Sequence, residues 1–295
     1  LAGPTCTQLM GDYGAEIIKI ERPGEGDDTR KWGPHCINDA NGDATTESAF
    51  YLSANRNKRS VAIDIATPAG QALIRRLLPK CDVLIENFRV GALSRYGLGH
   101  DDLRDDFPAL VYCSITGFGQ TGPRAHEAGY DFVVQAMSGF MALTGEPAGQ
   151  PMKMGISISD LTCGLYSVIG IQAALAMRER TGRGQHVDMA LLDCSVGLLA
   201  SQATHYLTTG ENPPRMGNEH AQVSAYGVFP VADGEVVLAP ANDGLFRKLL
   251  ALLGREDLLG EEKFGSNEAR LANRAELDVM IAAETRKWQL DELLA

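Results

Sequence analysis

Strand-like and helix-like segments alternate along the chain as far as about residue 195, and this alternation limits the fold more than any other feature. Strands are expected over residues 15–24, 60–66, 82–88, 109–119 and 184–193. Helices are expected over residues 5–14, 67–80, 101–108 and 130–145, and within 155–184. The pattern predicts an α/β fold with a doubly wound, Rossmann-like parallel sheet. In such sheets, ligands bind at the carboxyl ends of the strands.

After about residue 220 the pattern changes. Residues 225–241 predict a β-hairpin that turns at Asp233 and Gly234, and helices are expected over residues 242–254 and 274–288. The stretch before the hairpin is rich in Gly, Pro and Asn, as linkers are. We therefore predict a large domain over residues 1–200, a linker over 201–222 and a smaller α+β domain over 223–295.

Composition excludes several classes of protein. The formal net charge is −11 and the basic residues form no large cluster, so we expect no nucleic-acid partner. No apolar run approaches the length of a membrane span, so we expect no membrane association. The six cysteines form no CxxC pair, and no second pair of metal ligands accompanies His35 and Cys36. We expect reduced thiols, no metal, and a cytoplasmic or mitochondrial-matrix location.

Basic residues follow several of the predicted strands. Arg22 lies where the first strand runs into its Pro-Gly turn, and Arg89 and Arg95 come after the strand over 82–88. A single arginine is commonly a solvated surface charge, but their shared position at strand ends points to phosphate groups. The chain contains neither a GxxxxGK[ST] loop nor a GxGxxG turn after its first strand. We therefore expect a nucleotide-containing ligand that is held without those loops.

Asp160 is the only charged residue between Lys153 and Arg178, and it stands at the start of an apolar helix. Two interpretations compete. Ser157 and Asp160 fit a capping-box spacing, in which the carboxylate has a structural role. Alternatively, the carboxylate attacks a thioester and becomes an acyl anhydride, with backbone N–H groups holding the oxyanion. Gly155 and Gly164 would let a ligand approach the backbone closely.

Several stretches together resemble the class III CoA-transferases, the family that includes formyl-CoA transferase and carnitine CoA-transferase. The resemblance runs through AGPTCTQLMGDYGAEIIKIERPGEGD, NRNKRSVAIDI, DVLIENFRVGALSRYGLG, SITGFGQTGP, GYDFVVQAMSG, the Asp160 segment, TGRGQHVDMALLD and MGNEHAQVSAYGVFPVADGEVVLA. These stretches cover nearly the whole chain in the family's order. Family members are longer, so the resemblance implies that an N-terminal strand and a C-terminal segment are missing from this sequence.

The resemblance implies site residues and a mechanism. Asp160 stands at the position of the family's nucleophile, which forms an aspartyl anhydride and then an aspartyl-CoA thioester. The family's CoA-binding residues fall on Leu1, Ala2, Arg22, Asp64, Ile65, Asn87, Phe88, Arg89, Arg95 and Tyr130. The partners implied are an acyl-CoA, a small carboxylic acid and a second copy of the chain in an interlocked homodimer. Coenzyme A is then a substrate, and no permanently bound cofactor is expected.

The sequence departs from the family pattern at two places. Ala66 replaces a lysine found in many members, so a phosphate contact is lost or moved. A stretch GENPPRMGNEH stands where formyl-CoA transferase has a glycine-rich lid, which argues against formyl-CoA as the donor. The GDDTR and YCSITGFGQTGP stretches resemble the branch that uses succinyl-CoA and dicarboxylic acids such as glutarate. Arg30, Lys31 and Arg124 are candidates for binding the second carboxylate.

Two other functions stay open on the sequence alone. α-Methylacyl-CoA racemases share the Asp160 region, but they carry a His-Asp pair where this chain has Tyr130 and Asp131. A racemase needs a base on each face of the α-carbon, and tyrosine is a poor base at neutral pH. The other alternative is a non-catalytic CoA-binding protein in which Asp160 only caps its helix. Cys163 is interpreted as a residue that lines the pocket. His186 is interpreted as a half-buried packing residue.

Overall fold

The computed structural model describes residues 1–33 and 36–295, so His35 lies outside the described residues. Two compact units are present. Unit 1 comprises Leu1–Met141 and Lys153–Pro213, and unit 2 comprises Ala142–Met152 and Pro214–Ala295. The predicted domain limits, with a linker over residues 201–222, stay a prediction.

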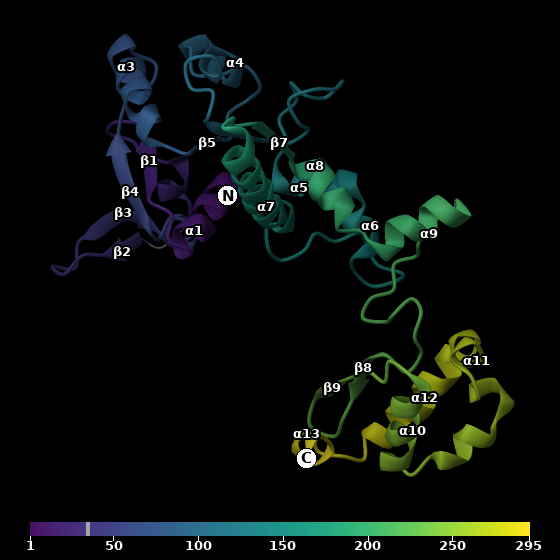
Figure 1. Cartoon of the computed structure of the whole chain (residues 1–295). Coiled ribbons are helices and arrows are strands. Elements are labelled where there is room, and N and C mark those ends of the chain that lie inside the picture. The colour runs from purple at the N-terminus through teal and green to yellow at the C-terminus, as the bar shows by residue number, and fades with distance from the viewer. Residues whose placement is uncertain (34–35) are drawn as a thin grey trace. The chain divides into compact units, whose positions relative to one another are not determined.

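Unit 1 contains all the parallel strands (Figure 1). Its described elements are, in order, α1 (Ala2–Asp12), β1 (Ile17–Glu21), η1 (Asp28–Lys31), β2 (Cys36–Asn38), β3 (Ala44–Ser48), α2 (Ala49–Ser53), β4 (Lys58–Ala62), α3 (Pro68–Leu77), η2 (Leu78–Lys80), β5 (Val83–Glu86), η3 (Leu93–Tyr96), α4 (His100–Leu103), β6 (Val111–Thr116), α5 (Asp131–Ser138), α6 (Phe140–Leu143), α7 (Ile158–Thr181), β7 (His186–Ala190), α8 (Leu191–Gly197) and α9 (Ser201–Thr209). Helix α6 crosses the boundary between the units.

The strands are parallel as the alternation predicts, but they form two sheets in place of the single sheet expected. β1 and β4 are parallel, and β5, β6 and β7 form a second parallel sheet with β6 in its centre. The antiparallel hairpin of β2 and β3 was not predicted, because its residues carry no period-two apolar pattern. The α/β fold with parallel sheets is therefore confirmed.

Helices cover both faces of these strands. On one face α1 and α7 pack on alternate strand residues such as Ile85, Cys113 and Ile115. On the other face the cluster around α3, η3 and α4 takes the intervening residues Leu84 and Tyr112. This division follows from the alternation of side chains along a strand. The sheet is thus covered on both sides, as in a doubly wound fold.

Local signals set the helix ends. Thr67 accepts a hydrogen bond from Gly70 N, and Pro68 is the first helical residue of α3, so both predictions there are confirmed. The single helix expected over 130–145 is wrong. Gly139 has φ of +100°, which separates α5 from α6. Glycine is favoured in this left-handed conformation because it has no Cβ.

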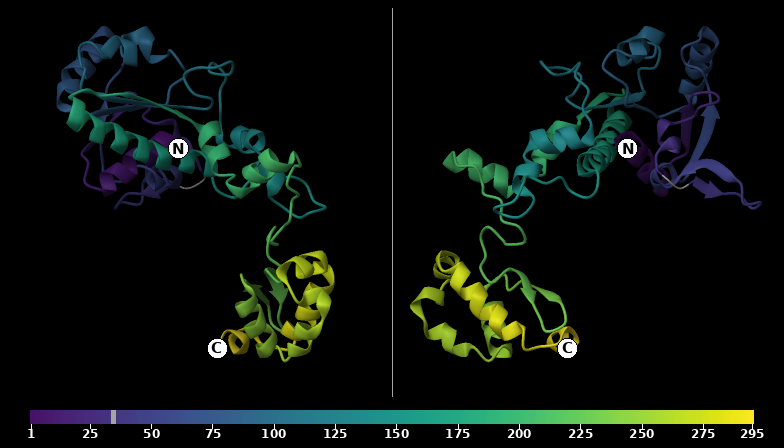
Figure 2. Two further views of the ribbon diagram at one scale, coloured as in Figure 1. Left: turned by 45° about the vertical axis from the view of Figure 1, so that its right-hand side comes forward. Right: turned by 180° about the vertical axis from the view of Figure 1, so that it is seen from behind.

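The contact between α1 and α7 is close because Gly164 lacks a side chain. A Cβ at this position would lie 2.9 Å from the Ala2 carbonyl oxygen and 3.1 Å from the Thr5 Cβ. The two helices lie side by side in every view (Figures 1 and 2). Gly164 therefore fixes how near the first turn of α1 comes to the first turns of α7.

Within the described chain, α7 alone is long and apolar enough to pass a test for a membrane span. We expected no such run. Its buried residues, including Cys163 and Ile171, pack in the core beneath α1 and the strands. A core helix passes the same test of length and composition.

Unit 2 combines a hairpin with helices. Its described elements are β8 (Gly227–Pro230), β9 (Glu235–Leu238), α10 (Asp243–Leu252), η4 (Glu256–Gly260), η5 (Glu262–Phe264), α11 (Asn267–Ala272), α12 (Arg274–Thr285) and α13 (Leu290–Leu294). β8 and β9 are antiparallel around the predicted turn, which is confirmed. Phe246, Phe264 and Leu277 are fully buried between the hairpin and the helices. Unit 2 therefore has a hydrophobic core of its own.

Replacing Gly164 tests the α1–α7 contact. Alanine normally favours a helix over glycine by about 1 kcal/mol. We expect Gly164→Ala to lower the free energy of unfolding instead, by about 1–3 kcal/mol, because the new methyl group overpacks the contact. Urea denaturation measures this. Gly155→Ala is the control, since no atom lies within 4 Å of a Cβ there. A stabilised Gly164→Ala variant would contradict the packing argument.

Candidate active site

The carboxyl ends of the strands gather many of the predicted ligand-binding residues. Glu21 pairs with Ala62 in register, so Arg22 and Asp64 follow neighbouring strands at one edge. Glu86 pairs with Ser114, and Asn87 follows β5 at the corresponding edge of the other sheet. Parallel strands place such residues together, whatever their separation in sequence.

The amino end of α1 lies at this edge as well. A Cβ on Gly3 would be 3.8 Å from the Asn87 Cβ and 3.9 Å from the Ile115 Cδ1. Leu1 is the N-cap residue, and Ala2 is buried. Leu1, Ala2 and Asn87 are therefore brought together by the structure. A helix amino end presents unpaired backbone N–H groups and a partial positive charge.

The amino end of α5 is fixed next to β6 by a glycine pair. A Cβ on Gly117 would lie 2.4 Å from the Gly129 Cα, so these two backbones can touch only as glycines. Tyr130 follows as the N-cap residue of α5, and its side chain is 70% exposed. Asp131 is then the first residue of the helix. Both side chains are thereby placed beyond the carboxyl end of β6.

Asp131 caps α7 across the fold. Its Oδ1 accepts hydrogen bonds from the backbone N–H of Ser159 at 2.9 Å and of Asp160 at 3.3 Å. The Ser157 side chain makes no capping hydrogen bond. The capping box suggested by the spacing of Ser157 and Asp160 is therefore wrong. A carboxylate from another helix satisfies these N–H groups, which leaves the Asp160 side chain without that structural role.

The surroundings of Asp160 shift its ionisation. Burial raises the pKa of its carboxyl, Asp131 raises it further, and the backbone N–H of Ala2 lowers it. Burial is the largest of these effects because it disfavours the charged form. The carboxylate is therefore half-buried, poorly solvated and faced by the amino end of α1.

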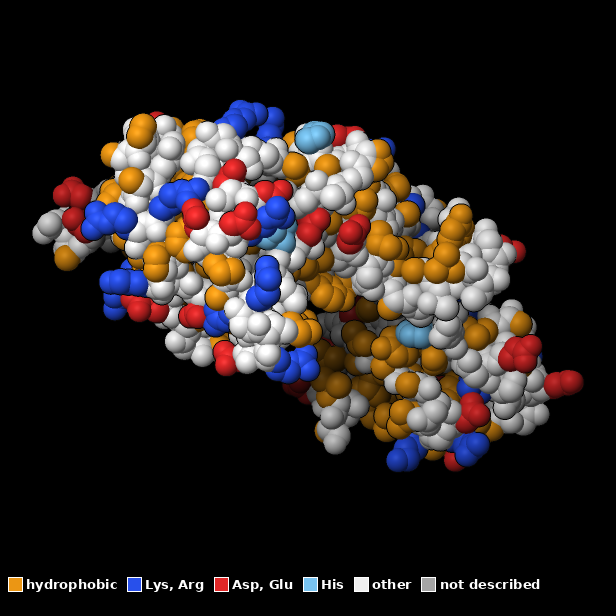
Figure 3. Space-filling model, turned by 45° about the horizontal axis from the view of Figure 1, so that its top comes forward, with side chains coloured by type: hydrophobic (Ala, Val, Ile, Leu, Met, Phe, Trp, Pro, Cys, Tyr) orange, Lys and Arg blue, Asp and Glu red, His pale blue; other side chains and the backbone are white. Residues whose placement is uncertain are grey.

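Several predicted residues lie on the surface. Arg22 is exposed and pairs with Glu25 at 2.8 Å, and Phe88 is 47% exposed. Arg89 and Arg95 are exposed, Asp64 accepts a hydrogen bond from Ala66 N, and Ile65 is half-buried. On the face shown in Figure 3, Lys and Arg side chains lie interleaved with Asp and Glu. Arg22, Arg89 and Arg95 thus lie at the surface beyond the strands that they follow.

Arg30 has a different role from the one considered for it. Its Nε and Nη2 donate to both oxygens of Glu21 at 2.8 and 2.9 Å, and its guanidinium lies 3.8 Å from the Tyr51 ring centroid. These bonds hold the pKa of the buried Glu21 carboxyl down at about 2. Arg30 is therefore used to fix the end of β1. Lys31 and Arg124 are exposed and lie near Glu25 and Glu127.

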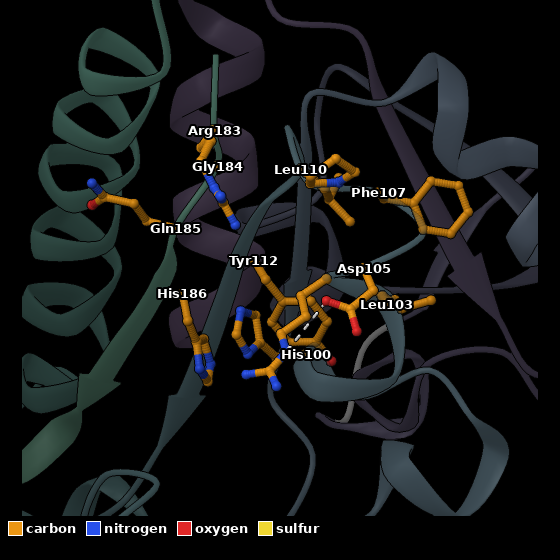
Figure 4. A pocket seen from close by; sticks show the side chains of 12 residues that line it. His100, Leu103, Asp105, Phe107, Leu110, Tyr112, Arg183, Gly184, Gln185 and His186 are labelled. Atoms are coloured by element: carbon orange, nitrogen blue, oxygen red, sulfur yellow. Dashed lines mark ion pairs between the residues drawn. The ribbon is translucent and has the colours of Figure 1, made fainter. Parts of the chain in front are cut away.

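A cavity of about 550 Å³ lies at the opposite, amino edge of β6 and β7 (Figure 4). The rings of His100 and His186 stack there with centroids 4.4 Å apart, and His186 Nε2 lies 2.9 Å from the Ser114 Oγ. Burial and the neighbouring His100 lower the pKa of His186. None of the described residues lining this cavity belongs to the predicted site. His186 is half-buried, as expected.

Sequence reasoning missed two residues beside Asp160. Asp131 was weighed only as half of a racemase pair, and Gln135 was not considered. Gln135 is fully buried and donates to Asp131 Oδ2 at 2.6 Å. Their spacing of four residues places both on one face of α5. That spacing, with Asp131 at a helix start, was the available signal.

The comparisons with known proteins agree with each other. The profile described as CoA-transferase family III matches residues 1–295. The succinate–glutarate CoA-transferase of Agrobacterium fabrum is 50% identical over 294 residues, covering 100% of this chain and 73% of that protein. The succinyl-CoA:glutarate CoA-transferase of Mus musculus is 42% identical over 293 residues, covering 98% of this chain and 66% of that protein. The solved structure of a CAIB/BAIF family protein from Brucella suis is 50% identical, with a TM-score of 0.87, and covers 100% of this chain and 77% of that one.

The two carboxylates at the head of α7 should differ in their effect on stability. We expect Asp131→Ala to lower the free energy of unfolding by about 0.5–2 kcal/mol, because α7 loses its cap. Asp160→Asn should leave stability at neutral pH unchanged or raised, because it removes a poorly solvated charge. Urea denaturation of both variants measures the difference. A larger loss from Asp160→Asn than from Asp131→Ala would show that Asp160 is the capping residue.

Proposed function

The chain belongs to CoA-transferase family III, and from this premise we propose that it moves CoA from an acyl-CoA donor to a carboxylic acid, with Asp160 as the nucleophile. The expectation of an enzyme of this family is confirmed by the comparisons. The observation that carries the proposed nucleophile is the cap on α7. Asp131 takes the capping role, so the half-buried Asp160 carboxylate is left for chemistry.

The proposed reaction proceeds through covalent intermediates on Asp160. An Asp160 oxygen attacks the thioester carbonyl carbon, the C–S bond breaks, and CoA leaves as a thiolate. The thiolate then attacks the aspartyl carbonyl of the mixed anhydride, which releases the donor acid and leaves an aspartyl-CoA thioester. The acceptor carboxylate attacks this thioester and expels the thiolate again. Finally the thiolate captures the acceptor acyl group, and the Asp160 carboxylate is restored.

The surroundings of Asp160 favour this chemistry. A carboxylate that is poorly solvated and has a raised pKa is a better nucleophile than a fully solvated one. The N–H of Ala2 at the amino end of α1 faces the same carboxyl. Such a backbone donor would stabilise the oxyanion that forms on the aspartyl carbonyl oxygen when the thiolate attacks it. Coenzyme A enters as a substrate, and the scheme uses no other cofactor.

We place CoA at the carboxyl ends of the strands. Its adenine and phosphates would meet residues at the ends of β1, β4 and β5, the amino end of α1 and the start of α5. These are the predicted residues Leu1, Ala2, Arg22, Asp64, Ile65, Asn87, Phe88, Arg89, Arg95 and Tyr130. The exposed guanidinium groups suit a solvent-facing phosphate, and the exposed rings of Phe88 and Tyr130 suit a base or a pantetheine arm.

The names of the relatives support a dicarboxylic substrate pair. Succinyl-CoA appears in several of them, combined with glutarate, D-citramalate or mesaconate. We propose succinyl-CoA as the donor and a dicarboxylic acid such as glutarate as the acceptor. The second carboxylate needs a cation, and Arg30 is already bound to Glu21. Lys31 and Arg124 remain candidates, since each lies at the surface in a weak ion pair.

A homodimer is part of the proposal. Large apolar side chains are exposed on α5, α7 and α9, including Phe132, Leu165, Ile169 and Leu207. Surfaces of this kind commonly mark a protein interface. We infer that a second copy covers them in an interlocked dimer.

A CoA-exchange assay tests the function directly. The protein is given succinyl-CoA with a pool of mono- and dicarboxylic acids, and the CoA esters are identified by mass spectrometry. We expect a new dicarboxyl-CoA, and we expect Asp160→Asn to abolish its formation with the fold intact, because an amide is a very poor nucleophile. Full activity in Asp160→Asn would reject the nucleophile. Exchange of α-deuterium into a branched acyl-CoA without any new ester would indicate a racemase.

Replacing Arg89 tests where the CoA phosphates bind. We expect Arg89→Ala to raise KM for acyl-CoA about tenfold and to leave kcat nearly unchanged, because a charge-assisted contact remote from the reacting carbonyl is lost. Steady-state kinetics at low and high salt measures this. Arg59→Ala is the matched control, because Arg59 is exposed near the amino end of β4. Equal KM values in both variants would place the phosphates elsewhere.

A further inference from the structure

Gln135 is a fully buried amide on α5, and both ends of it are hydrogen-bonded. Nε2 donates to Asp131 Oδ2 at 2.6 Å and to the Ile156 carbonyl oxygen at 3.4 Å. Oε1 accepts from the backbone N–H of Met154 at 2.8 Å. Burying an amide is unfavourable unless its donors and acceptor are satisfied. All three of these bonds run to the cap of α7 or to the chain that leads into it.

The chain segment that leads to Asp160 is therefore fixed by hydrogen bonds to several of its backbone groups. Gln135 bonds Met154 N and Ile156 O directly. Asp131 bonds Ser159 N, and its other carboxylate oxygen is bonded by Gln135. A single face of α5 thus contacts the chain from Met154 to the first turn of α7. The remaining residues of this approach are largely exposed, so little else packs on it.

We propose that Gln135 is a positioning residue for the nucleophile: it orients the Asp131 cap and fixes the chain before α7, so that Asp160 meets the thioester in one geometry. This rests on the proposed function of Asp160. Without Gln135, the Asp131 carboxylate can rotate about its χ2 bond, and the Met154 and Ile156 backbone groups lose their partner. Precise placement matters because a displacement of about 1 Å can reduce a rate roughly a hundredfold.

A neutral residue is required at this position. Asp160 is faced by Asp131 on α5 and by the backbone N–H of Ala2 at the start of α1. A second negative charge beside Asp131 would repel it from the head of α7. An amide supplies a donor to Asp131 and an acceptor to Met154 without adding charge. The protonated form of a glutamic acid can do the same, but its ionised form cannot.

Three variants separate positioning from a general structural role. Gln135→Leu removes all the bonds at similar volume. Gln135→Glu keeps the bonds to Asp131 and Met154 only while the new carboxyl is protonated, and it loses the longer bond to the Ile156 carbonyl. Ser138→Ala is the matched control, because Ser138 is buried on the same helix but bonds only the carbonyl of Gln135. Each is assayed for transfer across a range of pH, and its amide hydrogen exchange is measured.

We expect Gln135→Leu to lower kcat by about 10- to 100-fold with little change in KM for acyl-CoA. For Gln135→Glu, the ratio of its kcat to that of the wild type should fall as pH rises, because ionisation of the new carboxyl breaks the bond to Asp131. The backbone amides of Met154, Ser159 and Asp160 should exchange faster in Gln135→Leu than in Ser138→Ala.

The positioning role is overturned if Gln135→Leu keeps the wild-type kcat and unchanged amide hydrogen exchange. It is also overturned if the kcat of Gln135→Glu equals that of the wild type at every pH. Equal losses of kcat in Gln135→Leu and Ser138→Ala would also overturn it, since the effect would then be general destabilisation. If Gln135→Leu fails to fold, the Gln135→Glu ratio still decides. If the wild type transfers no CoA while exchange responds as expected, the proposed function fails and the role of Gln135 in holding the head of α7 stands.

Discussion

α1 and α7 approach each other closely because Gly164 presents no side chain to the Ala2 carbonyl. This contact sets the position of the amino end of α1, which in turn lies against Asn87 at the end of β5. It is also part of the hydrophobic core, because residues from both helices pack on the same face of the strands. The backbone donors facing Asp160, and the edge where CoA is proposed to bind, therefore share one packing constraint.

Two carboxylates near the amino end of α7 have different roles. Asp131 accepts hydrogen bonds from the N–H groups of the first turn of the helix, and Gln135 donates a hydrogen bond to its other oxygen. Asp160, in the first turn of the same helix, takes no part in the cap with its side chain, faces the N–H of Ala2 and has a raised pKa through burial. A capping carboxylate is neutralised by its donors, whereas a nucleophile needs a lone pair that no strong donor occupies. Separating the roles satisfies both requirements.

Much of the architecture follows from local signals. The parallel strands, the cap at Thr67 and the hairpin around Asp233 were predictable, because each depends on periodicity or on a turn within a few residues. The break at Gly139 and the pairing of Arg30 with Glu21 were missed. Arg30 was considered as a ligand for the second carboxylate of the substrate, because its actual partner Glu21 lies on a different element. In the same way, the spacing of Ser157 and Asp160 suggested a capping box, but the actual cap comes from Asp131, which is distant in sequence.

The cap supplied by another helix has a consequence for how this protein can diverge. Because the N–H groups of Ser159 and Asp160 bond Asp131, the Ser157 side chain has no capping duty, and Gly155 and Ile156 are exposed. Substitutions at these three positions leave the side chain that caps the nucleophile's helix unchanged. Residues 155–157 can therefore change in type during evolution, and with them the side chains in front of the Asp160 carboxylate, while the cap on α7 is kept.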